Sequence, residues 1–289
     1  MTPTQLCQIC GGQGRSWLER LSRRMVRCES CDFSWVVEGV SRSAHGSTIY
    51  EDDETVFEDG VDYYLDDTAK EAARDKLEWV KRFVRPGGAV LDVGSNVGMF
   101  ASVAQTEFDV VGIEPSRTAA DLARSRYGAP VEVGSIYEHR SDFVGRFDAV
   151  TLFDVFEHLP DGKQALRQCL KYLAPDGHLF LSTPNKSSWM ARLAGRHWHY
   201  IDLKEHIALY NRFNLTKLVN GVGFRLVGTR TIGRRYRCSY IERRLRFLGR
   251  GSMFLRLIHL CALPLLLFPG RRIPIHLGDV LGIVVRRDS

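Results

Sequence analysis

Hydrophobic positions form two kinds of pattern along the middle of the chain, short runs and regularly spaced single positions. Short apolar runs, such as 89–93 and 109–113, are typical of buried strands. Between these runs, apolar residues recur three or four positions apart, as in 68–84, which is typical of amphipathic helices. The expected elements, in chain order, are helix 68–84, strand 89–93, helix 97–105, strand 109–113, helix 116–127, strands 130–133 and 147–152, helix 161–173, strand 178–182, helix 214–221, and strands 224–232 and 278–287.

Strands that alternate with helices indicate a parallel sheet that is covered on both faces. We therefore expect an α/β fold with a doubly wound sheet of seven strands, in which the last strand, 278–287, pairs beside 224–232. Ligands of such sheets bind at the carboxyl ends of the strands. The residues that directly follow the strands are therefore the first candidates for a site.

The first predicted strand ends at a turn in which Gly94 and Gly98 carry no Cβ, so that a ligand can approach the backbone closely. The N–H groups at the start of the next helix can then face polar groups of a nucleotide-like cofactor. Asp92 precedes this turn, and Glu114 lies twenty residues after Gly94, at the end of the second strand. A carboxylate at that point is placed to accept hydrogen bonds from both ribose hydroxyls.

Four motifs in this part of the chain resemble those of class I S-adenosylmethionine (SAM)-dependent methyltransferases of the ubiquinone-biosynthesis-like, type 11 or 23 group. The resemblance covers 90–185 and implies a Rossmann-like methyltransferase sheet. One difference is Asn96, where the family usually has a glycine, but Asn tolerates a left-handed backbone better than most residues. The motifs are Leu91-Asp92-Val93-Gly94 with Gly98, then Gly112-Ile113-Glu114-Pro115-Ser116, then Phe147-Asp148-Ala149-Val150 with Phe156-Glu157-His158-Leu159, and finally Leu173 to Leu179.

The resemblance implies SAM as the cofactor. By position, Ser135 would hydrogen-bond the adenine amine and Ile136 would pack on the adenine ring, while Phe153 would lie beside the sulfonium. The cofactor-binding residues that we predict are Asp92, Gly94, Ser95, Asn96, Gly98, Glu114, Pro115, Ser135, Ile136 and Phe153.

The candidate catalytic residues are Asp154, Glu157 and His158, which follow the fourth strand, and His206, which lies in the segment after the fifth. Three interpretations stay open for them. In the first, these residues only hold the loop in place. In the second, one histidine is a general base, since an ordinary histidine pKa near ~6.5 suits base catalysis at neutral pH. Alternatively, Asp154, Glu157 and His158 bind a divalent cation at the acceptor site, as in some ubiquinone-pathway O-methyltransferases that the segment resembles.

Two CxxC pairs, Cys7 with Cys10 and Cys28 with Cys31, stand seventeen residues apart near the N-terminus. This spacing predicts a zinc ribbon with four thiolate ligands, and a complete ligand set makes the zinc structural. Disulfides or unligated thiols are the alternative. No apolar segment follows Met1, so we expect a cytoplasmic protein and reduced cysteines. If the ribbon is lost, we expect 90–230 to stay folded.

Charge is spread unevenly over the chain, whose net charge is +6. Residues 51–67 hold nine acids, whereas 225–289 hold fourteen arginines and three acids. Within the C-terminal part, 254–268 is apolar and flanked by arginines, which predicts a peripheral membrane contact through 243–272 on the cytoplasmic face, or else a packed helix or a dimer contact. The domains we expect are a zinc ribbon over 1–40, an acidic linker over 41–67, the SAM-binding domain over 68–233, a basic and apolar insertion over 234–275 and the final strand over 276–289.

The leading hypothesis for function is O-methylation of a small or lipid-linked acceptor, such as a saccharide or an isoprenoid intermediate. An RNA methyltransferase is the second hypothesis, because some rRNA-modifying members also begin with a zinc ribbon. However, Leu152 to Val155 contains no Asn-Pro-Pro-Tyr motif, so a nucleic-acid partner is disfavoured.

A non-catalytic docking protein is the third hypothesis, and the presence of Asp92, Gly94 and Glu114 argues against it. The loop is not GxGxxG, which argues against a Rossmann dehydrogenase.

Overall fold

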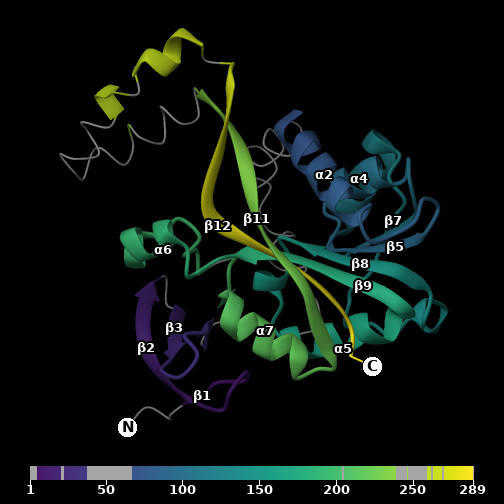
Figure 1. The fold of residues 1–289 in the computed structure, drawn as a ribbon, viewed down its shortest axis with the longest axis horizontal. Coiled ribbons are helices and arrows are strands. Elements are labelled where there is room, and N and C mark those ends of the chain that lie inside the picture. The colour runs from purple at the N-terminus through teal and green to yellow at the C-terminus, as the bar shows by residue number, and fades with distance from the viewer. Residues whose placement is uncertain are drawn as a thin grey trace. The chain divides into compact units, whose positions relative to one another are not determined.

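Seven strands form one sheet at the centre of the largest part of the molecule (Figure 1). The computed structural model describes residues 5–20, 23–37, 67–203, 205–238, 246, 259–261, 263–268 and 270–288, so the predicted linker 41–67 lies outside the described residues except for its last position. The strand order is β11-β12-β9-β8-β5-β6-β7. The strands are β5 (Ala89–Val93), β6 (Asp109–Glu114), β7 (Val131–Val133), β8 (Phe147–Phe153), β9 (Leu173–Pro184), β11 (Phe224–Arg237) and β12 (Arg272–Arg287).

The five strands from β9 to β7 run parallel, and β12 pairs antiparallel with β9. The sheet and its helices confirm the predicted α/β, doubly wound fold, and β12 lies beside β11 as expected. The helices are α2 (Asp67–Val80), α3 (Met99–Ala104), α4 (Arg117–Tyr127), α5 (Gly162–Tyr172), α6 (Trp189–Ala194) and α7 (Arg212–Asn220), with short 3-10 turns η2 (Ser141–Phe143), η3 (Phe156–His158), η4 (Gly195–His197) and η5 (Leu263–Leu267).

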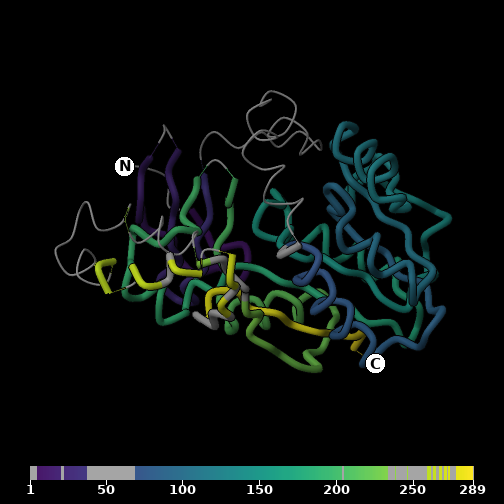
Figure 2. Tube along the Cα trace, turned by 90° about the horizontal axis from the view of Figure 1, so that it is seen from above, coloured from purple at the N-terminus to yellow at the C-terminus, as the bar shows by residue number. Residues whose placement is uncertain are grey.

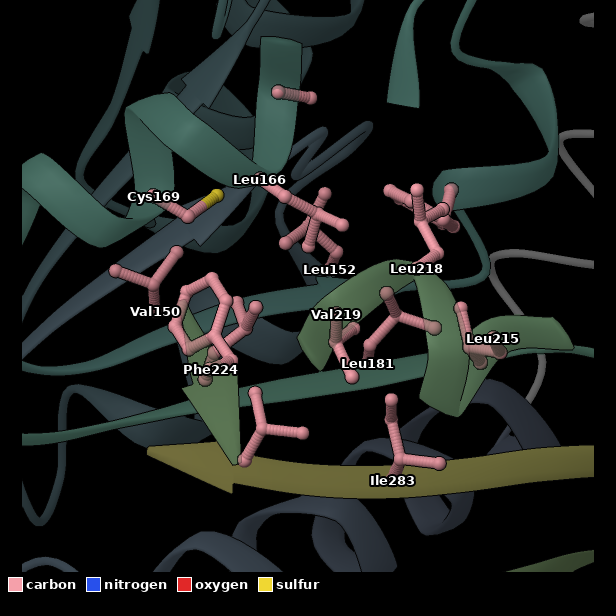
Figure 3. Close-up of a cluster of buried hydrophobic side chains, with 14 of the residues drawn as sticks. Val150, Leu152, Leu166, Cys169, Leu181, Leu215, Leu218, Val219, Phe224 and Ile283 are labelled. Atoms are coloured by element: carbon pink, nitrogen blue, oxygen red, sulfur yellow. The ribbon is translucent and has the colours of Figure 1, made fainter. Parts of the chain in front are cut away.

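Each face of the sheet has its own buried core. On one face, apolar side chains of α5 and α7 pack onto β8, β9 and β12, with Leu166, Leu218 and Leu181 among them (Figure 3). On the other face, α2, α3 and α4 cover the sheet through residues such as Val80 and Phe100. Helices on both faces close the sheet and leave the carboxyl ends of the parallel strands as the edge where a site can form.

A second, smaller sheet begins with the N-terminal strands, β1 (Gln5–Leu6), β2 (Gln13–Arg20), β3 (Arg23–Cys28) and β4 (Ser34–Val36). These strands pair antiparallel in sequence order. The fifth strand of this sheet is β10 (Ala208–Leu209), from the segment after β9, which pairs antiparallel with β4. Figure 2 shows the purple N-terminal strands beside the green segments of the main part.

Buried polar contacts strengthen this junction. The Nζ of Lys186 donates to the carbonyl oxygen of Asp32 at 2.8 Å, to its Oδ1 at 2.9 Å and to the Oγ of Ser34 at 2.6 Å. The Nδ2 of Asn214 donates to the carbonyl oxygen of Cys31 at 3.2 Å. Phe33 is fully buried, and its ring lies 5.0 Å from that of Tyr210. The N-terminal ribbon therefore shares a sheet and a core with the rest of its unit.

The chain divides into two compact units, one comprising Met1–Ile232 with Gly278–Ser289 and the other comprising Gly233–Leu277. The second unit contains the whole of the predicted segment 243–272, of which only residues 246, 259–261, 263–268 and 270–272 are described. In those residues, the large apolar side chains of Leu260, Leu263, Leu267 and Phe268 are exposed. No helix in the described part of the chain is long and apolar enough to cross a membrane.

Candidate functional site

The loop between β5 and α3, residues 94–98, is called the cofactor loop below. It places three residues in the left-handed region, namely Gly94 at φ 69°, Asn96 at φ 50° and Gly98 at φ 73°. Asn96 thus adopts the backbone that the sequence predicts for it. A Cβ on Gly94 would lie 2.6 Å from a methyl carbon of Val155, so the close approach of these two segments requires glycine. This loop follows the carboxyl end of β5 and packs against Val155.

Glu114 ends β6 beside this loop and is 5% exposed. Its Oε2 accepts the N–H of Asn96 at 2.9 Å, and its Oε1 accepts the N–H of Ser116 at 2.9 Å. Burial raises the pKa of Glu114, and these two backbone donors oppose that shift. The hydrogen bonds fix the carboxylate in one orientation, and each oxygen has a second lone pair for a ligand hydroxyl.

Asp92 lies under the loop and is almost fully buried. Its Oδ1 accepts the hydroxyl of Thr151 at 2.7 Å, and the hydroxyl of Ser95 donates to its carbonyl oxygen at 2.9 Å. Burial raises the pKa of the Asp92 carboxyl to about 6, and the Thr151 hydrogen bond lowers it in part. Asp92 therefore ties the loop to β8 and titrates close to neutrality.

The other predicted cofactor residues follow the neighbouring strands. Pro115 follows β6 and precedes Ser116, whose Oγ caps α4 by accepting the N–H of Ala119. Ser135 and the buried Ile136 follow β7, and the Oγ of Ser135 accepts the N–H of Tyr137 at 3.3 Å. Because β5, β6, β7 and β8 are parallel, these residues share one edge of the sheet with Phe153, the last residue of β8.

Asp154 does not join the other candidate catalytic residues. Its Oδ2 accepts from Nζ of Lys76 at 2.9 Å, and its Oδ1 accepts the hydroxyl of Ser182 at 3.0 Å. The Lys76 ammonium also lies 5.0 Å from the centroid of the Phe153 ring. Sequence reasoning did not single out Lys76, because a lysine in an amphipathic helix looks like any solvent-facing charge.

Glu157, His158 and His206 come together instead. One ligand atom from each of these residues lies within 4.8 Å of the others. The two imidazole rings are 4.9 Å apart. Nδ1 of His158 is 2.8 Å from the carbonyl oxygen of Glu205, and Nδ1 of His206 is 2.8 Å from that of Tyr200.

A carbonyl oxygen only accepts, so Nδ1 of each ring carries the proton and Nε2 keeps its lone pair. Burial lowers the pKa of both His158 and His206, which keeps the rings neutral. Burial, with the charge of Asp154, raises the pKa of Glu157 to about 7. Oε2 of Glu157 is buried and has no hydrogen-bond partner within the described residues. Two oriented imidazoles and one such carboxylate form a donor set that suits a divalent cation.

The four N-terminal cysteines also converge. Sγ of Cys7 lies 3.6 Å from Sγ of Cys31, and Sγ of Cys10 lies 3.4 Å from Sγ of Cys28. A tetrahedral zinc site with bonds of about 2.3 Å separates its sulfurs by about 3.8 Å. Backbone N–H groups of Ile9 and Gly12 point at two of the sulfurs, at 3.4 Å each, as expected for thiolates. The residues present therefore fit a structural zinc ion.

The methyltransferase domain family matches residues 64–229, more than half of the chain, and this range contains the cofactor loop and the Glu157–His158–His206 cluster. The chain belongs to this family, in its class I, SAM-dependent form. A loop with three residues in the left-handed region, beside a fixed and buried Glu114, fits an adenosine-bearing cofactor.

Among curated relatives, the ubiquinone biosynthesis O-methyltransferase of Proteus mirabilis is 32% identical over 117 residues, which are 38% of this chain and 48% of that protein. The enzyme of the same name from Xanthomonas axonopodis pv. citri is 35% identical over 119 residues, 39% of this chain and 50% of that protein. The chain thus spans about half the length of these relatives. A SAM-dependent methyltransferase structure from Thermotoga maritima aligns over 83% of this chain and 99% of its own, with a TM-score of 0.53 and 18% identity, which shows a shared fold.

Proposed function

We propose that this protein transfers the methyl group of SAM to an oxygen atom of a small or lipid-linked acceptor, such as an isoprenoid or saccharide intermediate. The observation that carries the proposal is the cluster of Glu157, His158 and His206. The buried Glu157 and the partly buried His158 follow β8 just after Val155, which packs against Gly94 of the cofactor loop, and the partly buried His206 comes from the segment after β9. The names of the ubiquinone biosynthesis O-methyltransferases, which this chain resembles over 117 to 119 residues, support oxygen as the methylated atom.

The cofactor, when bound, supplies an activated methyl group on a sulfonium. The protein's own residues bind and orient it. Gly94 lets the loop pack closely against Val155, Glu114 accepts from the ribose hydroxyls, and Ile136 provides an apolar wall for the adenine. Methyl transfer from a sulfonium needs mainly an aligned acceptor in a dry site, so positioning and exclusion of water account for most of the rate.

The cluster would act on the acceptor hydroxyl. We propose that Glu157, His158 and His206 hold a divalent cation, which lowers the pKa of a hydroxyl that it binds. The orphaned Oε2 of Glu157 supports this role, since burying an unpartnered carboxylate oxygen is costly unless a ligand compensates. Without the cation, a neutral His158 or His206 is itself able to accept the acceptor proton.

The cofactor assignment is tested with Glu114→Gln. The amide keeps the size of the side chain but presents an NH2 group to one of two backbone donors, so S-adenosylhomocysteine should bind more weakly by about 1–3 kcal/mol. Glu132→Gln, at an exposed position on β7, is the control and should bind as the wild type does. Isothermal titration measures both. Equal affinity in Glu114→Gln and the wild type would refute the role of Glu114.

The cation assignment is tested with Mn²⁺, whose binding is followed by electron paramagnetic resonance on zinc-loaded protein. His206→Ala removes one of three ligands, so Mn²⁺ affinity should fall by at least about tenfold. His197→Ala, an exposed histidine on η4, is the matched control. If His206→Ala binds Mn²⁺ as well as the control does, the cluster is a proton acceptor or a loop support rather than a cation site.

The lipid-linked acceptor is the reason to propose a peripheral membrane contact as well. Exposed Leu263, Leu267 and Phe268 and the arginines of 243–272 would meet an apolar interface with anionic headgroups. Cosedimentation with vesicles of phosphatidylglycerol should exceed that with neutral vesicles and fall at high salt. A folded wild type that ignores anionic vesicles at low salt would favour a water-soluble acceptor.

A further inference from the structure

A cavity of about 330 Å³ lies between the N-terminal ribbon and the segment that follows β9. Trp17 and Arg27 of the ribbon line it from one side, and Arg192, Arg196 and Trp198 line it from the other. Its volume falls in the range of small-ligand sites. The proposed cofactor site does not use these side chains.

The charge of this cavity is strongly positive. Four basic side chains line it, and the one acidic side chain among the lining residues is Asp32. Asp32 forms ion pairs with Arg27 and with Lys186, so its charge is shared between them. All three donors of the Lys186 ammonium are already used by Asp32 and Ser34. Lys186 therefore lines the cavity and adds positive charge, but it has no donor left for a ligand.

Arg192 and Arg196 are the two basic side chains of the lining that do not pair with Asp32. Both are exposed, and within the described part of the chain no carboxylate pairs with either. They stand four positions apart, on α6 and on η4, and both line the same cavity. Guanidinium groups prefer planar or tetrahedral oxyanions because they donate two parallel hydrogen bonds. The cavity thus offers two uncommitted forks to one anion.

Aromatic side chains provide the apolar part of the cavity. Trp17 lies with its ring 4.7 Å from the Lys186 ammonium, and Trp198 is 2% exposed. The indole N–H of Trp198 is buried and has no acceptor among the described residues. A ligand that carries a ring or an apolar chain next to an oxyanion would match both kinds of wall.

Ring contacts join this cavity to the candidate catalytic cluster. The Trp198 ring lies 5.2 Å from the Tyr200 ring, and the Tyr200 ring lies 5.8 Å from that of His206. The carbonyl oxygen of Tyr200 also accepts from Nδ1 of His206. The short segment from Trp198 to His206 therefore borders the cavity at one end and orients a cluster histidine at the other.

We propose that this cavity binds the oxyanion of the acceptor, a phosphate ester or a carboxylate attached to a ring or an apolar chain. The inference rests on the proposed function, because it makes the cavity the anionic subsite of the same acceptor that the His158–His206 cluster activates. Arg192 and Arg196 bind the oxyanion, and Trp17 and Trp198 pack against the part of the acceptor next to it.

Titration calorimetry on the full-length, zinc-loaded protein tests the subsite, with phenyl phosphate, benzoate and phenol as probes. Phenyl phosphate or benzoate should bind, and neutral phenol should not. Replacing Arg192 and Arg196 together by alanine should lower the affinity for the anion by at least about tenfold, because charge-assisted hydrogen bonds are lost. The control, Arg126→Ala with Arg167→Ala, removes the same charge from exposed positions on α4 and α5 and should bind as the wild type does.

The probe that binds identifies the anionic group of the acceptor. Binding of phenyl phosphate alone supports a phosphorylated acceptor, and binding of benzoate supports a carboxylated one. Failure of both anions, or equal weakening in the control variant, overturns the subsite. S-adenosylhomocysteine is titrated in parallel and should bind the Arg192/Arg196 variant as it binds the wild type. A wild type that binds this cofactor product but neither anion refutes only the subsite. A wild type that binds an anion but not the cofactor product refutes methyl transfer, and with it the assignment of the anion as acceptor.

Discussion

Three buried carboxylates at the carboxyl edge of the sheet differ in how they are satisfied. Glu114 accepts two backbone N–H groups, Asp92 accepts the Thr151 hydroxyl, and Glu157 keeps one oxygen without a donor in the described residues. Burial opposes ionisation in each, and donors offset part of that cost. A carboxylate with fewer donors depends more on a ligand, and for this reason we propose a cation at Glu157 and a fixed ribose-binding surface at Glu114.

Asp92 gives a pH prediction at the scale of a single residue. Burial raises its pKa from 3.8 to about 6, so the native state holds the proton more tightly than the unfolded chain does. The free energy of unfolding should therefore fall as the pH rises from about 4 to above 6, by up to about 3 kcal/mol from this group. Asp92→Asn cannot ionise and still accepts from Thr151, so it should be more stable than the wild type at pH 8 and closer to it at pH 4.5.

Urea denaturation at the two pH values measures this difference. Asp176→Asn, an exposed carboxylate outside the site, is the control and should show no such change in relative stability. An Asp92→Asn protein that is equally destabilised at both pH values would show that the charge of Asp92 is needed for folding rather than tolerated.

At the scale of elements, the presence and order of the strands of the main sheet were predictable, whereas the full lengths of β9, β11 and β12 and the contacts between distant elements were not. The apolar run 89–93 matches β5 residue for residue, whereas the helix expected from residue 97 begins at Met99, because Gly98 caps it in the left-handed region. β10 has two residues, too few for any sequence period, so its pairing with β4 gave no signal. His158 and His206 were each candidates, but their convergence depends on that tertiary packing.

The cofactor loop gives a prediction with an internal control. Gly94 and Gly145 have nearly the same φ, 69° and 67°, but a Cβ on Gly94 would clash with Val155, whereas one on Gly145 meets nothing within 4 Å. Gly145→Ala should cost about 1–2 kcal/mol from the left-handed backbone alone. Gly94→Ala should cost more, and it should also weaken S-adenosylhomocysteine binding. Denaturation and calorimetry report the two effects, and equal losses in both variants would argue against a tight loop.

At the scale of the whole molecule, the ribbon is part of the main unit rather than an appendage. The CxxC spacing predicted the four ligands, and their sulfurs do converge. The expectation that 90–230 would stay folded without the ribbon did not foresee Lys186, Asn214 and β10, which join the two. A lysine that ends up buried against Asp32 has no sequence signature, because charged residues are normally read as solvent-exposed. The ribbon also provides one wall of the cavity, and its strand β4 pairs with β10, which begins two residues after His206.

Loss of zinc should therefore affect the whole unit. Elemental analysis should find one zinc ion per chain, and Cys28→Ser should abolish it. Because Cys28 and Cys31 lie in the same buried core as Tyr210 and Leu215, we expect Cys28→Ser to lower the free energy of unfolding by more than about 4 kcal/mol, with the ribbon and the sheet unfolding in one transition.

Cys261→Ser, at an exposed cysteine outside the ligand set, should keep both the zinc and the stability of the wild type. Tryptophan fluorescence and far-ultraviolet circular dichroism follow the unfolding, since Trp17 and Trp35 belong to the ribbon and Trp79 packs on the sheet. A zinc-free Cys28→Ser protein whose sheet melts at the wild-type temperature would show instead that the ribbon folds on its own and that its contacts with Lys186 and β10 contribute little.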